Sequence, residues 1–223
     1  MNLANGSCGT TEYSTEEIVA MRRQESLKAA ELLGAAYYES LVNDLDVFYT
    51  QSVISKVVAR IRQIKPDIML LPSPEDYMED HMNTCRIGVT AAFCKGMPNY
   101  ASDPSVPPIF QDITLYHALP YGLADGLRRI IVPDLYTDVT TVINRKQEML
   151  ACHVSQKKWL DESQGLDSYL ITMRKMTEQM GNMSGKFEYA EGWRRHSHLG
   201  FSAIEIDPLG EMLKGRVVIV AAL

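Results

Sequence analysis

The chain of 223 residues is long enough for one α/β domain with a well-buried core, and its 46% apolar and 22% charged residues are typical of a globular protein. Its formal net charge of −6, without a lysine and arginine cluster, argues against a nucleic-acid-binding surface. The four scattered cysteines form no Cys-x-x-Cys pair, which argues against a zinc ribbon or a disulfide framework. The chain shows neither a signal peptide nor an apolar run long enough to span a bilayer, so we expect a cytoplasmic protein.

Two helices are predicted in the first third of the chain. Ser14 and Glu17 form a capping-box pattern ahead of the first helix, and Gly34 ends it. Apolar residues recur at helical spacing over residues 53–64 and indicate the second helix, which Pro66 stops.

Short apolar stretches between helical patterns predict a sheet. Strands are expected at residues 67–71, 113–117, 130–132 and 217–223, with a strand-and-turn region at 41–49 and a loop at 96–108. Further helices are expected over about 79–95, 138–159 and 163–180, then a break at 181–185 and a short element at 188–195. This alternation predicts a single α/β domain over residues 1–223, Rossmann-like, with a mostly parallel sheet flanked by helices. Residues 1–4 look like the end of a strand only, so we expect the first strand to be missing or replaced.

The stretch from Lys65 to Arg86 is the strongest candidate for a site. Its strand leads into a loop and a helix start that hold Asp76, Glu79, Asp80 and His81. Open α/β sheets bind ligands at the carboxyl ends of their strands, and imidazole with carboxylate is a typical zinc-ligand set. His81 is therefore a candidate ligand, although a histidine beside acids is more often a hydrogen-bonding residue at a helix end. The neighbouring acids can act as a general base, or they can simply be first-turn acids that the helix dipole stabilises. Asp80 is the best placed of them to orient His81.

Three other polar clusters have plainer interpretations: Arg22 and Arg23 with Glu25, His153 with Ser155, and His196 with His198. The first fits a solvated, charged helix face. The second is no nucleophile pair, because the G-x-S-x-G pattern is absent. The two histidines of the third can chelate a metal at their spacing, although surface histidines are the commoner case. Nucleotide-binding motifs are absent.

Five segments occur in an order that resembles a known family. The first is Arg-x-x-Glu in a helix that ends in Leu-Gly, the second is Lys-Pro-Asp before an apolar strand, and the third is Asp-Tyr-x-x-Asp-His. The fourth begins with Asp-Val-Thr and continues with Lys, Met-Leu and His-x-Ser-Gln, and the fifth is Tyr-Ala-Glu-Gly-Trp. The order resembles the PIG-L/LmbE-like family of metal-dependent N-deacetylases over most of residues 14–195. The resemblance implies a Rossmann-like fold. It also implies a hydrolase that uses a divalent ion such as Zn²⁺ to remove N-acetyl groups from amino sugars and related conjugates.

The resemblance also assigns roles to residues of this chain. It implies that His81 is a metal ligand, that Asp80 supports it, and that Arg22 is an electrostatic support near the catalytic carboxylate. Met78 stands where the family has a histidine that assists at the oxyanion. Mainly structural roles are implied for Asp138, His153, Ser155, Gln156 and Glu191.

One segment of the family is absent from these 223 residues: a strand followed by Ala-His-Pro-Asp-Asp, which supplies two metal ligands and the general base. His81 alone does not hold a catalytic zinc, which needs three protein ligands. Three explanations are open: the chain is N-terminally incomplete, it is a noncatalytic binding or scaffold relative, or Val217–Val220 fills the vacant strand position in its own chain or a neighbour. We therefore predict an impaired deacetylase of an N-acetylated sugar conjugate, with the noncatalytic relative as the alternative. An incompletely covered sheet would favour a homo-oligomer.

Overall fold

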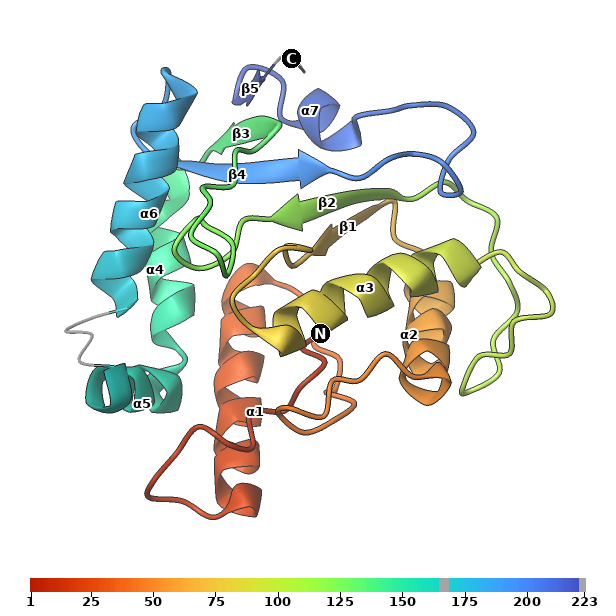
Figure 1. Ribbon diagram of the computed structural model, residues 1–223, viewed down its shortest axis with the longest axis horizontal. Helices are drawn as coiled ribbons and strands as arrows, with labels where there is room; N and C mark the ends of the chain where they lie inside the picture. Colours follow the sequence, from red (N-terminus) through yellow and green to blue (C-terminus); the bar gives the residue numbers. More distant parts are fainter. Residues whose placement is uncertain (165–168, 221–223) are drawn as a thin grey trace. The chain divides into compact units, whose positions relative to one another are not determined.

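The computed structural model describes residues 1–164 and 169–220 (Figure 1). The chain divides into two compact units, each assembled from two separate segments. Unit 1 comprises Met1–Val47 with Asp138–Ala190, and unit 2 comprises Phe48–Thr137 with Glu191–Leu223. The single domain over residues 1–223 stays a prediction. In the part of the chain that is described, no helix is both long and apolar enough to cross a membrane.

Unit 1 is helical. It contains α1 (Thr15–Leu33), the 3₁₀ turn η1 (Thr140–Val142), α4 (Ile143–Ala151), α5 (Val154–Gln164) and α6 (Tyr169–Ser184). Helix α1 packs against α4 and α5, and both of these contact α6. The predicted capping box is confirmed, because the Ser14 hydroxyl accepts from the Glu17 N–H at 3.3 Å and the Glu17 carboxylate accepts from the Ser14 N–H at 2.9 Å.

One prediction for unit 1 is wrong, and a second is right only in part. The helix expected over 138–159 is divided, because Asp138 ends a strand and Cys152 and His153 separate α4 from α5. The break expected at 181–185 begins later than predicted, because α6 continues through Gly181 to Ser184 and Gly185, with φ +66°, follows its end. Gly181 serves close packing: a Cβ there would lie 2.3 Å from the Glu188 carbonyl oxygen. Residues 165–168 of the helix predicted over 163–180 lie outside the described residues.

Unit 2 contains a five-stranded sheet with the order β1-β2-β4-β3-β5 (Figure 1). The strands are β1 (Ile68–Leu71), β2 (Thr114–Ala118), β3 (Leu135–Asp138), β4 (Ala190–Arg195) and β5 (Val217–Ile219). Strand β1 pairs with β2 in parallel, whereas β2 pairs with β4 and β3 with β5 in antiparallel orientation. The predicted α/β class is confirmed. The sheet is mixed rather than mostly parallel, because β4 and β5 return beside their partners in the opposite direction.

The helices of unit 2 are α2 (Gln51–Ile64), α3 (Glu79–Cys94) and the short α7 (Pro208–Met212). Helix α2 packs on α3, which also contacts β1, and Val58, Ile87 and Tyr116 are fully buried in this core. The predicted loop at 96–108 is confirmed. Buried Arg62 secures it by donating to backbone carbonyls from Cys94 to Val106.

Two expected strands are reduced to single bridges. Residues 130–132 form only an isolated bridge from Ile130 to Ala124, and the Ile130 side chain is exposed instead of buried. In the 41–49 region only Val42 bridges, to Ala4. The sequence analysis missed β3 and α7, because both stretches are too short to show a clear helical or alternating pattern of apolar residues.

Strand β5 lies at the edge of the sheet, beside β3. The Ile219 side chain is 64% exposed, so the prediction of a buried, parallel-type strand is wrong. The hypothesis that Val217–Val220 fills a vacant first-strand position in its own chain is also wrong. The first strand of such a fold lies inside the sheet between two other strands, whereas β5 has β3 as its one neighbour in the described sheet. Residues 221–223 of the predicted strand lie outside the described residues.

Candidate functional site

The loop between β1 and α3 is shaped by two short side chains. The Ser73 hydroxyl donates to the Glu75 carbonyl at 2.6 Å and accepts from the Glu75 N–H at 3.1 Å. Two residues further on, Asp76 Oδ1 accepts from the Met78 N–H at 3.0 Å. Side chains that bond to backbone two residues on are typical of tight turns, and here they fix the chain between the strand end and the helix start.

Asp76 and His81 form the central pair of this loop. His81 Nδ1 lies 3.1 Å from Asp76 Oδ1; the Asp76 side chain is only 4% exposed, whereas that of His81 is 42% exposed. An Nδ1–H that donates to the carboxylate leaves His81 Nε2 with its lone pair available. The Tyr77 ring meets the imidazole edge-on. The structure therefore confirms that this loop gathers polar groups at the carboxyl end of β1.

Asp76 is a carboxylate that the structure places beside the His81 ring, and the expected support of His81 by Asp80 is not tested by this contact. Asp80 itself is buried in the first turn of α3. Its catalytic support role stays a prediction, as does the ligand role of His81. The sequence placed Asp76 among the candidate acids, but the five-residue spacing gave no reason to prefer it. A turn that brings Asp76 back beside the helix start makes the contact.

Arg22 belongs to unit 1 and holds the chain ahead of α1. Its Nη1 and Nη2 atoms donate to the carbonyls of Gly6 and Gly9, each at 2.7 Å, and Nη1 lies 3.8 Å from Asp44 Oδ2. Gly6 has φ +80°, and a Cβ there would lie 2.3 Å from Arg22 Cδ. The guanidinium and the glycine loop thus fit together. The predicted role of Arg22 near a catalytic carboxylate stays a prediction.

The solvated-face interpretation of the first helix is right for one of its residues and wrong for two. Arg23 forms an exposed ion pair with Glu39. Arg22 and Glu25 are instead largely shielded from solvent. Burial lowers the pKa of the Arg22 guanidinium, while Asp44 and Glu25 oppose that change. An amphipathic pattern does not reveal such burial, because both side chains are charged.

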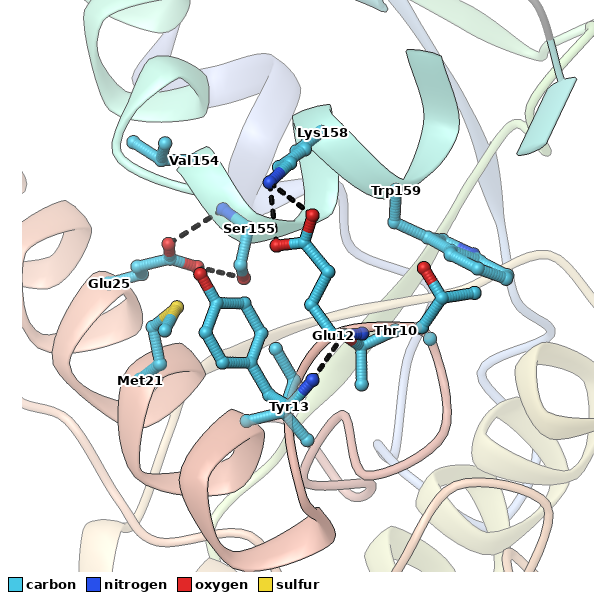
Figure 2. Close-up of a pocket in the computed structure, with 12 residues that line it drawn as sticks. Thr10, Glu12, Tyr13, Met21, Glu25, Val154, Ser155, Lys158 and Trp159 are labelled. Carbon is cyan, nitrogen blue, oxygen red and sulfur yellow. Dashed lines mark hydrogen bonds and ion pairs between the residues drawn. The ribbon is translucent and has the colours of Figure 1, made fainter. Parts of the chain in front are cut away.

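Figure 2 shows a cavity of about 90 Å³ within unit 1, bounded by the chain before α1, by α1 and by the start of α5. Glu25 points from α1 to Ser155, which donates both its N–H and its hydroxyl. Lys158 of α5 contacts the Glu12 carboxylate at 2.6 Å. The Ser155 hydroxyl is thus committed to a carboxylate, which agrees with a structural role and not with that of a nucleophile.

The described residues do not complete a zinc site. Within residues 1–164 and 169–220, no group of three or more histidine, cysteine, aspartate or glutamate side chains is placed to hold a metal. The metal-chelating pair considered for His196 and His198 stays a prediction, and the structure places His196 Nδ1 2.9 Å from His117 Nε2. The sequence analysis missed His117, since an isolated histidine in an apolar strand carries no motif.

A family model and a curated relative are similar to this chain. A family model described as PIG-L: GlcNAc-PI de-N-acetylase matches residues 1–92. Diacetylchitobiose deacetylase from Thermococcus kodakarensis is 29% identical over 202 residues, which cover 86% of this chain and 69% of that protein.

Solved structures share the fold. N,N'-diacetylchitobiose deacetylase from Pyrococcus horikoshii matches with a TM-score of 0.68 and 23% identity, over 92% of this chain and 75% of that one. GalB, the 4-carboxy-2-hydroxymuconate hydratase of Pseudomonas putida KT2440, matches with a TM-score of 0.67 and 20% identity, over 89% of this chain and 78% of that one. At these identities the likeness shows the fold alone, and this fold hosts a hydratase as well as deacetylases.

Proposed function

We propose that the chain, which is similar to N-deacetylases of the PIG-L type, is a member of the PIG-L/LmbE-like family and removes an N-acetyl group from an amino sugar or a related sugar conjugate. The observation that carries this proposal is the 29% identity to a diacetylchitobiose deacetylase along 86% of the chain. The matched stretch is too long to reflect one shared motif.

The loop between β1 and α3 supports the proposal. It lies at the carboxyl end of β1, where open α/β sheets bind their ligands. Asp76 Oδ1 lies 3.1 Å from His81 Nδ1, a placement that favours the imidazole tautomer with its hydrogen on Nδ1. An imidazole fixed in this way can hold or transfer a proton at the amide of a bound substrate, or contribute one ligand to a metal.

Zinc dependence is proposed from the family alone. A divalent ion would supply an activated water for amide hydrolysis. Because the described residues do not provide three ligands, no reaction step through a metal follows from their geometry. The same observation favours a second candidate function, a noncatalytic relative that binds an N-acetylated sugar without turnover.

Acetate release distinguishes the two functions. The purified chain is incubated with N,N'-diacetylchitobiose, with and without added Zn²⁺, and acetate is measured by a coupled enzyme assay. A deacetylase releases acetate, and His81→Gln lowers the rate at least 100-fold. His198→Gln is the matched control and leaves the rate unchanged. Absence of acetate under every metal condition overturns the deacetylase proposal, and calorimetric binding of the same sugar then supports the noncatalytic relative.

A further inference from the structure

A second cavity lies within unit 2, on one face of the sheet. It has a volume of about 370 Å³, in the range of small-molecule sites. Side chains of α3, the ends of β2 and β4, and His196 and Ser197 form its wall. The described residues that line it include three arginines and two histidines but no aspartate or glutamate. The charge around this cavity is therefore positive, in a chain whose net charge is −6.

The three arginines differ in how far they are neutralised. Arg194 Nη1 contacts Glu75 Oε2 at 2.6 Å, and Arg195 is held by Glu205. Arg86 stacks over the Tyr49 ring, 5.1 Å from its centre, and has no carboxylate partner in the described part of the chain. Tyr49 is itself fixed by a hydrogen bond of 2.9 Å to Thr90. Arg86 is thus a positioned cation whose hydrogen-bond donors remain available.

A chain of hydrogen bonds fixes the two histidines. His117 Nδ1 lies 3.1 Å from the Pro72 carbonyl, which only accepts, so Nδ1 carries the hydrogen. His117 Nε2 is then an acceptor, and His196 Nδ1 donates to it at 2.9 Å. This leaves His196 Nε2 with a lone pair and with no protein donor among the residues described. Burial lowers the pKa of both histidines, which agrees with two neutral rings.

The cavity therefore offers cationic donors and one neutral acceptor. We propose that it binds a small hydroxylated anion, whose carboxylate or phosphate meets Arg86 and whose hydroxyl donates to His196 Nε2. An arginine fork matches the geometry of either anion. The neutral imidazole accepts a hydroxyl hydrogen, which an arginine cannot do. This site uses neither Asp76 nor His81 and does not depend on the deacetylase function.

Calorimetric titration of the full chain with gluconate, glucose 6-phosphate and hexanoate tests the site. Gluconate carries a carboxylate and glucose 6-phosphate a phosphate, so the two probes show which anionic group the site prefers. At least one of them is expected to bind. Arg86→Gln is expected to weaken that binding at least tenfold, because a charge-assisted hydrogen bond is lost. Arg216→Gln, an exposed arginine of unit 2 outside this cavity, makes the same charge change and leaves the affinity unchanged.

His196→Asn tests the acceptor separately. Asparagine can still donate to His117, but it removes the acceptor at the Nε2 position. We expect the affinity for gluconate to fall about tenfold, while that of hexanoate, which has no hydroxyl, changes little. Absence of binding by both hydroxylated probes overturns the proposal. Equal weakening by Arg86→Gln and Arg216→Gln also overturns it, since this would show only a general effect of net charge.

Discussion

Glu25 on α1 accepts two hydrogen bonds from Ser155, one from its N–H and one from its hydroxyl, each 2.8 Å long. Both residues are buried, and they are 130 positions apart in the chain. Ser155 stands in the first turn of α5, where backbone N–H groups lack partners within the helix and the helix dipole favours a negative charge. Glu25 thus caps α5 from α1 and joins two helices of unit 1.

Replacing Glu25 is expected to destabilise unit 1. In Glu25→Gln the neutral amide weakens both bonds and faces the Ser155 donors with its own donor group, at a cost of about 2 kcal/mol. Urea unfolding followed by circular dichroism measures the change. Glu31→Gln, at an exposed position of the same helix, is the control and should cost less than about 0.5 kcal/mol. Equal losses in the two variants would contradict the capping role.

Arg22 and Arg23 are adjacent, but their different surroundings predict different losses of stability when each is replaced by glutamine. Arg22→Gln removes the bonds to the carbonyls of Gly6 and Gly9 in a mostly buried setting, which should cost about 2–3 kcal/mol. Arg23→Gln removes only an exposed ion pair with Glu39, worth less than about 1 kcal/mol. Thermal melts of both variants give the order. Faster proteolysis within residues 6–9 in Arg22→Gln alone would support the loop-holding role.

Cysteine alkylation should distinguish Cys85 from Cys8. Burial raises the pKa of the Cys85 thiol to about 11, whereas Cys8 is exposed. The thiolate is the reactive form, so Cys85 is both inaccessible and protonated at pH 8. Iodoacetamide labelling followed by peptide mass spectrometry should show modification of Cys8 at least 100-fold faster. Similar rates for the native protein would contradict the burial of Cys85.

The His117–His196 pair predicts a loss of stability in mild acid. Burial lowers the pKa of both rings in the folded chain, and Arg194 lowers that of His117 further, while the Pro72 carbonyl opposes this change. The unfolded chain therefore takes up protons first as the pH falls through about 6.5, and the folded state loses stability below that value. Melting temperatures between pH 8 and pH 5 measure the effect. His117→Gln should give a shallower slope over this range, and an unchanged slope would contradict the assignment.

Asp76 should act on catalysis through His81. Asp76→Asn no longer fixes the imidazole tautomer, so acetate release should fall about 10–100-fold. Glu79→Gln, an exposed acid in the first turn of α3, should change the rate little. Nitrogen NMR of the His81 ring separates positioning from misfolding. A tautomer shift in a variant with unchanged melting temperature supports positioning, and an unchanged tautomer contradicts it.

Local signals in the sequence predicted the elements that depend on local physics. The capping box at Ser14 and Glu17, the strand after Pro66 and the helix start at Glu79 all follow from neighbouring residues. Burial of Glu25 and pairing of His117 with His196 depend on partners 130 and 79 positions away, which no periodicity encodes. The order of the sheet was not predictable for the same reason.

Within the described chain, β1 pairs only with β2 and forms one edge of the sheet. Its four residues lead directly into the loop that positions Asp76 and His81. An edge strand is held by backbone hydrogen bonds on one side only, so it opens at a lower free energy than an inner strand. Amide hydrogens of β1 should exchange with solvent before those of β2. The order of the Asp76–His81 pair is therefore limited by local opening of β1 and not by the global stability of the chain.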